Sequence, residues 1–69
     1  MTLEELKQHL EEIKEEILDL QVDLDLLKAI ENPNDKTKRT IFCKEYELES
    51  LQYIKEDIKN EIEKRNTNN

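Results

Sequence analysis

The strongest indication of the fold is the pattern of residues 3–27, LEELKQHLEEIKEEILDLQVDLDLL. Its leucines and isoleucines recur in alternating steps of three and four residues. They are Leu3, Leu6, Leu10, Ile13, Ile17, Leu20, Leu24 and Leu27. This heptad spacing places the listed side chains along one narrow stripe of a helix. The pattern predicts a long helix that packs through this stripe, which we call the seam, as in a coiled coil.

Residues at both ends of this stretch set the limits of the first predicted helix. Thr2 and Glu5 have the spacing of a capping box, in which each side chain accepts a hydrogen bond from the other residue's backbone N–H. Pro33 disfavours helical geometry at the residue before it. We therefore expect a helix over residues 3–31 and a turn over residues 32–35.

A second helix is predicted over residues 36–65, followed by a frayed tail at residues 66–69. Two helices of similar length joined by a short turn pack against each other in antiparallel orientation. The second helix supplies its own seam residues: Ile41, Leu48, Leu51, Ile58 and Ile62. The predicted fold class is all-α, a single two-helix antiparallel hairpin that assembles into a dimeric four-helix bundle. The alternative is a parallel dimer formed through the first helix.

The two stripes fit together when the numbers of paired residues add up to 68. This register brings Leu20 to Leu48 and aligns the other apolar pairs, although Lys44 then faces Leu24. The flanking charges do not support it, because Asp23 would lie near Glu47. Exposed ion pairs contribute only about 0–1 kcal/mol, so the apolar contacts are expected to determine the register.

Composition limits the classes of protein and partner. The chain has 69 residues, of which 42% are charged, and it contains no Gly and no Trp. A sheet-based fold needs frequent turn residues, which are missing here. The formal net charge is −7, and the first 31 residues carry most of it. Such an acidic chain is unsuited to binding nucleic acid, since phosphates are neutralised by Lys and Arg.

Away from the seam, the half of the hairpin next to the turn carries apolar residues on the outer faces of both helices. These predicted interface residues are Leu18, Val22, Leu26 and Ile30 on the first helix, and Phe42, Cys43, Tyr46 and Tyr53 on the second. Exposed apolar patches usually mark an interaction surface. We expect the two outer faces to point away from each other, so that one hairpin cannot cover them.

Chemically active residues are sparse. His9 lies between Glu5 and Glu12, but a metal site would need further ligands from facing helices, and the sequence has a single His. Cys43 has no evident base or oxyanion site and cannot form a disulfide within the chain. There is no glycine-rich loop for phosphate. We therefore predict no catalytic, metal or cofactor site, and a protein that is not an enzyme.

These observations favour a small protein–protein interaction module. The expected partner is the protein itself, as a homodimer or larger assembly, in a scaffolding or regulatory role; another protein is the second choice. One alternative function is inhibition of a host protein, in one form by an acidic mimic of nucleic acid. Another is a nucleic-acid-linked regulator that uses Lys36, Lys38 and Arg39 near the turn. The composition suggests a phage or mobile element, and the lack of a signal or membrane segment predicts a cytoplasmic location.

Overall fold

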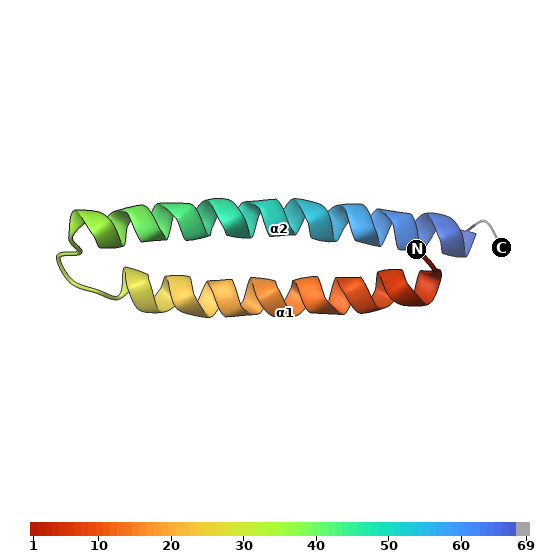
Figure 1. Cartoon of the computed structure of the whole chain (residues 1–69), viewed down its shortest axis with the longest axis horizontal. Helices are drawn as coiled ribbons and strands as arrows, with labels where there is room; N and C mark the ends of the chain where they lie inside the picture. Colours follow the sequence, from red (N-terminus) through yellow and green to blue (C-terminus); the bar gives the residue numbers. More distant parts are fainter. Residues whose placement is uncertain (68–69) are drawn as a thin grey trace.

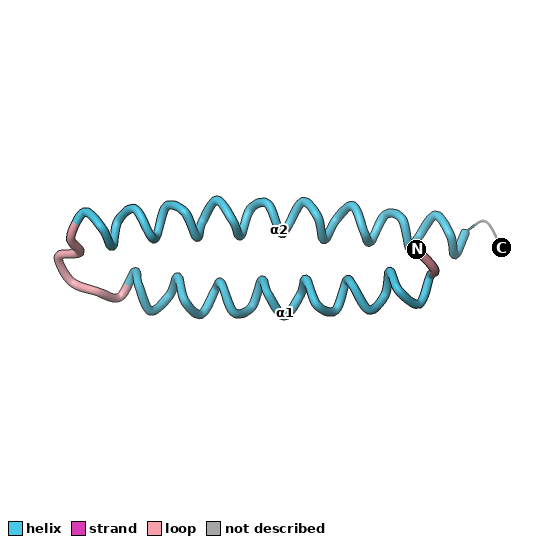
Figure 2. The backbone as a smooth tube through the Cα atoms, in the orientation of Figure 1, coloured by secondary structure: helices cyan, strands magenta, loops and turns pink. Residues whose placement is uncertain are grey.

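The computed structural model describes residues 1–67 as two antiparallel helices, α1 (Leu3–Lys28) and α2 (Asp35–Thr67), lying side by side (Figure 1). The molecule is a rod of 55 × 15 × 14 Å. One loop joins the helices at one end, and the N-terminus lies near the end of α2 at the other (Figure 2). The predicted all-α hairpin is confirmed. The tail predicted at residues 66–69 is helical through Thr67, and its last two residues lie outside the described part.

The start of α1 is fixed by the capping box that the sequence predicted. The Glu5 backbone N–H donates to Thr2 Oγ1 at 3.1 Å, and the Thr2 backbone N–H donates to Glu5 Oε1 at 3.3 Å. The Thr2 backbone N–H, and after it the Thr2 hydroxyl, holds the pKa of the Glu5 carboxyl below its ordinary value. Two backbone donors that the helix itself leaves unpaired are thereby satisfied.

The end of α1 corrects the predicted boundary. The helix ends at Lys28, whereas the sequence predicted residue 31. The Ile30 backbone N–H donates to the Leu27 carbonyl at 3.2 Å, and Asn32 adopts a left-handed backbone with φ of 54°. Pro33 restricts only the residue before it, but the chain needs several residues to reverse direction. Ile30 therefore lies in the loop, not on the helix where the sequence placed it.

The start of α2 is capped by Asn34. Its Oδ1 atom accepts a hydrogen bond from the Thr37 backbone N–H at 2.8 Å, and its carbonyl accepts from the Lys38 N–H at 3.0 Å. Asparagine is among the residues preferred at this position. The helix begins at Asp35, one residue before the predicted start, and runs past the predicted end at residue 65.

The seam between the helices is the only apolar core in the part of the chain that the structure describes. Every predicted seam residue is buried or half-buried. The most buried are Leu6, Ile13, Ile17, Leu20, Leu24 and Ile58, and Leu10, Leu48, Leu51 and Ile62 pack against four of them. The core is one side chain wide, so the outer faces of both helices remain open to solvent.

Ion pairs across the seam differ from those that the register implied. Asp23 was expected beside Glu47, but its Oδ2 atom lies 3.4 Å from Lys44 Nζ. The long Lys44 side chain lies half-buried along the seam and reaches sideways to the carboxylate. Lys28 and Glu45 form a second pair across the helices at 3.9 Å. Lys44 is half-buried but the other three side chains are exposed, so each pair stabilises the hairpin by at most about 1 kcal/mol.

Candidate interaction surface

Exposed apolar side chains gather in the half of the hairpin next to the loop. All eight predicted interface residues are exposed, and Phe42 is the most open at 72%. On α1, Leu18, Val22 and Leu26 are 57–67% exposed and follow one another at steps of four residues. Among the described residues, the other large apolar side chains that are exposed are Met1 at the open end and Ile54, which lies near the middle beside Tyr53. The apolar surface therefore lies mainly in the half next to the loop and reaches the middle of the rod at Tyr53 and Ile54.

On α2, the aromatic side chains alternate with carboxylates along one outward row. A shallow hollow is lined by Phe42, Glu45, Tyr46 and Glu49, and a second one by Glu49, Gln52, Tyr53 and Glu56. Because Glu49 borders both hollows, the surface between them is continuous. The aromatic residues were predicted from the sequence, whereas the neighbouring acids Glu49 and Glu56 were not. The signal for them was present, since Glu49 and Glu56 follow Phe42 at steps of seven residues.

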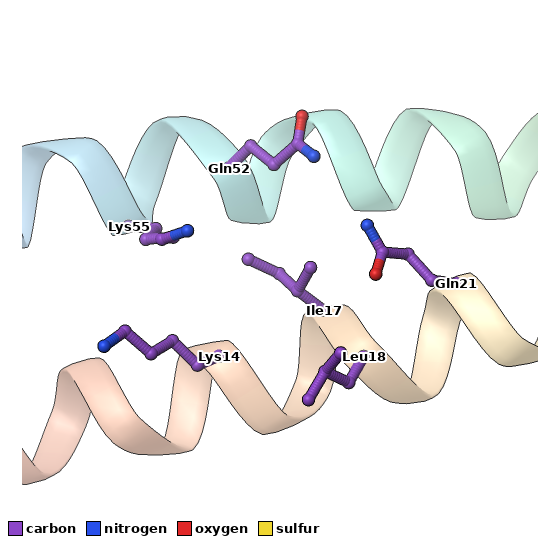
Figure 3. Close-up of a pocket in the computed structure, with 6 residues that line it drawn as sticks. All are labelled: Lys14, Ile17, Leu18, Gln21, Gln52 and Lys55. Atoms are coloured by element: carbon purple, nitrogen blue, oxygen red, sulfur yellow. The ribbon is translucent and has the colours of Figure 1, made fainter.

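A third hollow joins the two helices on one flank of the rod (Figure 3). It is lined by Lys14, Ile17, Leu18, Gln21, Gln52 and Lys55. Ile17 points towards α2, whereas Leu18 turns outward from α1 on the same flank (Figure 3). Gln52 also borders the hollow beside Tyr53, so the flank connects Leu18 to the aromatic row of α2.

At Leu18 alone, this connection departs from the expectation that the two apolar faces point away from each other. In an antiparallel pair, equivalent heptad positions of the two helices lie on the same flank of the seam. Leu18 directly follows the seam residue Ile17, as Phe42 follows Ile41 and Glu49 follows Leu48. Part of the α1 patch therefore shares a surface with the α2 row, while Leu26 lies further round the helix.

The charges around this surface are unevenly paired. Lys36, Lys38 and Arg39 are exposed in the first turns of α2, and none of them forms an ion pair among residues 1–67. Glu49 is likewise without an ion pair in the described chain, and Glu56 has one at 3.9 Å with Lys59, one turn further along α2. Helix α2 thus has a positive end by the loop and carboxylates further along the same side.

Residues 1–67 hold no group of three or more His, Cys, Asp or Glu side chains arranged to bind a metal ion. Cys43, one of the predicted interface residues, is exposed. The side chain was expected to be covered by an interface, and in the single hairpin its position faces outward. Neither helix, over the described residues, has the length and apolar content that a bilayer crossing requires.

Comparison of the chain with models of known families, with characterised proteins and with solved structures gave no match.

Proposed function

We propose that this protein is a non-enzymatic interaction module that associates with itself through the apolar surface next to the loop. The observation that carries the proposal is the contrast between the two halves of the rod. The seam continues through both halves, but large exposed apolar residues are concentrated in one of them. Water-exposed apolar area of this kind is buried favourably when two surfaces meet, by roughly 25 cal/mol per Å².

The size of the core supports the same proposal. A chain of 69 residues buries a small fraction of its surface and is marginally stable alone. In this hairpin only six apolar side chains are buried, and none is completely inaccessible to solvent among the described residues. Association would add a second apolar layer to the one-residue-wide seam. A homodimer is the expected form, because two-fold symmetric dimers are the commonest assemblies of a single chain.

The experiment places a charge on each outer face of the surface with the double substitution Val22→Glu and Tyr46→Glu. Sedimentation equilibrium and circular dichroism are measured over a hundredfold range of concentration. A self-associating hairpin should become monomeric and lose helicity, since its stability depends on association. The matched control, Gln8→Glu with Asn66→Glu, adds the same charge at exposed positions of the other half and should stay assembled.

Two results would count against the proposal. If the wild-type protein is a well-folded monomer at every concentration, self-association is wrong. If the double variant keeps both its mass and its helicity, the apolar surface does not hold the assembly together. A folded monomer whose helicity is unchanged by the substitutions would point to a different protein as the partner for this surface.

A further inference from the structure

The outward face of α2 carries a second heptad stripe in addition to the seam. The stripe, which we call the outer row, consists of Arg39, Phe42, Tyr46, Glu49, Tyr53 and Glu56. Successive members are three and four residues apart, which places them along one side of the helix. All six are exposed, and the three aromatic members are about 70% accessible. A helix with two such stripes can pack against a partner helix on each side.

We infer that the outer row pairs antiparallel with the outer row of a second copy, in the register where paired residue numbers add up to 95. This inference rests on the proposed self-association and names its geometry. In this register, Phe42 meets Tyr53 of the second copy, and two-fold symmetry repeats the contact. Arg39 meets Glu56, and Tyr46 meets Glu49, to which the phenol can donate a hydrogen bond.

Charge repulsion argues against a parallel pairing, and the number of contacts within the row separates the antiparallel registers. A parallel pairing would place each residue against its own copy, so Arg39 would face Arg39 and Glu49 would face Glu49. Like charges in direct contact oppose association. Shifting the antiparallel pairing by one heptad leaves Tyr53 opposite Asp35, or Phe42 opposite Asn60. The shift that brings Tyr53 to Asp35 also pairs Phe42 with Tyr46 and Arg39 with Glu49, but it places Glu56 opposite Asn32, outside α2. The register at 95 is the one in which all six members of the row meet another member of the row.

In the same arrangement, the basic residues at the start of α2 lie near charged residues of the second copy. Beside the row, Lys36 of one copy lies next to Asp57 of the other, which are opposite charges. On the other flank, Lys38 lies near Lys59, an unfavourable pair. Both flanks are exposed to solvent, where single pairs contribute little. The contacts within the row, including Arg39, which has no ion pair within the described hairpin, therefore determine the register.

The surface area fits a dimer that also uses α1. An aromatic side chain offers about 150–250 Å² for burial. The dimer has six aromatic side chains in its two outer rows, three from each copy, and at about 70% exposure they supply about 850 Å². Specific dimers bury about 1,200–2,000 Å² in total. The centre of the pairing lies between Glu47 and Leu48. Leu18 lies at nearly this level on the connected flank, and it contributes to the remaining area.

The first test exchanges the charges of the terminal pair. Arg39→Glu or Glu56→Arg alone creates two like-charge contacts per dimer. Each should raise the dimer dissociation constant by about tenfold at low salt, and less at high salt. The double variant restores opposite charges and should return to within about threefold of the wild type. Lys64→Glu, an exposed residue outside the row, is the control and should have little effect.

The second test measures the register directly. A nitroxide label is attached at Lys64→Cys in a Cys43→Ser background, and the distance between labels is measured by pulsed dipolar spectroscopy. With a rise of 1.5 Å per residue, the register at 95 separates the labels by about 50 Å along the helix axis. Registers shifted by one heptad give about 39 or 60 Å, and a parallel pair gives about 20 Å or less.

The outcomes separate this inference from the proposed function. A distance near 50 Å together with rescue in the charge exchange supports the register. A dimer with one of the other distances, or without rescue, overturns the register but leaves self-association intact. A protein that remains monomeric at all concentrations overturns both.

Discussion

Replacing Leu24 or Leu26 by alanine tests the difference in burial between the core and the outer face of α1. Leu24 is 4% exposed in the seam, and Leu26, two residues later on the same helix, is 67% exposed. Replacing leucine by alanine removes three carbon groups, each contributing about 0.8 kcal/mol when buried. Leu24→Ala should therefore cost about 2.3 kcal/mol, near the lower end for core leucines, because a thin core relaxes readily.

The same calculation for Leu26→Ala gives at most about 0.8 kcal/mol, and the higher helix propensity of alanine reduces it further. For a domain of this size, the Leu24 substitution corresponds to a drop of about 10–18 °C in melting temperature. Thermal unfolding is followed by circular dichroism at a low concentration, where sedimentation shows monomer, and again at a high concentration.

At low concentration the two variants should differ by about 1.5 kcal/mol or more in the free energy of unfolding. If Leu26→Ala is as destabilising as Leu24→Ala in the monomer, the burial pattern of the hairpin is wrong. If the cost of Leu26→Ala rises with protein concentration, while that of Leu24→Ala stays constant, Leu26 is part of the interface. If neither cost changes with concentration, Leu26 lies outside it.

Three further predictions concern the helix ends. Thr2→Ala and Asn34→Ala should each destabilise the hairpin by about 1 kcal/mol in urea titrations, because each removes a helix cap. Thr40→Ala is the control: it removes a hydrogen bond from the hydroxyl to a backbone carbonyl inside α2 and should change the stability by less than about 0.5 kcal/mol. Asn32→Gly should leave the melting temperature unchanged or raise it slightly, while Asn32→Ala should cost about 1 kcal/mol, because only glycine and a few polar residues readily adopt its left-handed backbone. The pKa of the Glu5 carboxyl is lowered in the folded state, so the folded state binds this proton less readily than the unfolded state does. The stabilisation by Glu5 is therefore fully present above pH about 4.3 and is lost as the pH falls through the folded-state pKa. Glu5→Gln should remove this part of the acid sensitivity of the melting temperature, and an unchanged pH profile would contradict the role of the capping box.

The helix ends also show how far sequence reasoning reaches. The Thr2 cap was predictable because its partner, Glu5, lies three residues away, and the contact depends on local geometry alone. The end of α1 was not predictable, because neither Lys28 nor Ala29 is a type of residue that ends a helix. The path of the chain back towards α2 decides where that helix stops, and this path depends on both helices at once.

Side-chain contacts between the helices needed the structure for a similar reason. The apolar register follows from the spacing of the seam residues, but the Asp23–Lys44 pair depends on the reach of a flexible lysine. The heptad count placed Asp23 beside Glu47, since it assigns one neighbour per position. The long, flexible side chain of a lysine can form an ion pair with any of several neighbouring acids, and at an exposed site these pairs differ little in free energy.

Sequence periodicity was sufficient to predict the two helices, the seam that joins them and the apolar character of the half next to the loop. These features follow from the period of the helix, which repeats along the chain and needs no knowledge of distant residues. The packing of the two helices was needed to show that Leu18 lies on the same flank as Gln52, which also borders the hollow beside Tyr53. The reason is physical: a periodic pattern tells which side of its own helix a residue occupies, but the flank it shares with another helix is set by how the two helices rotate and align when they pack.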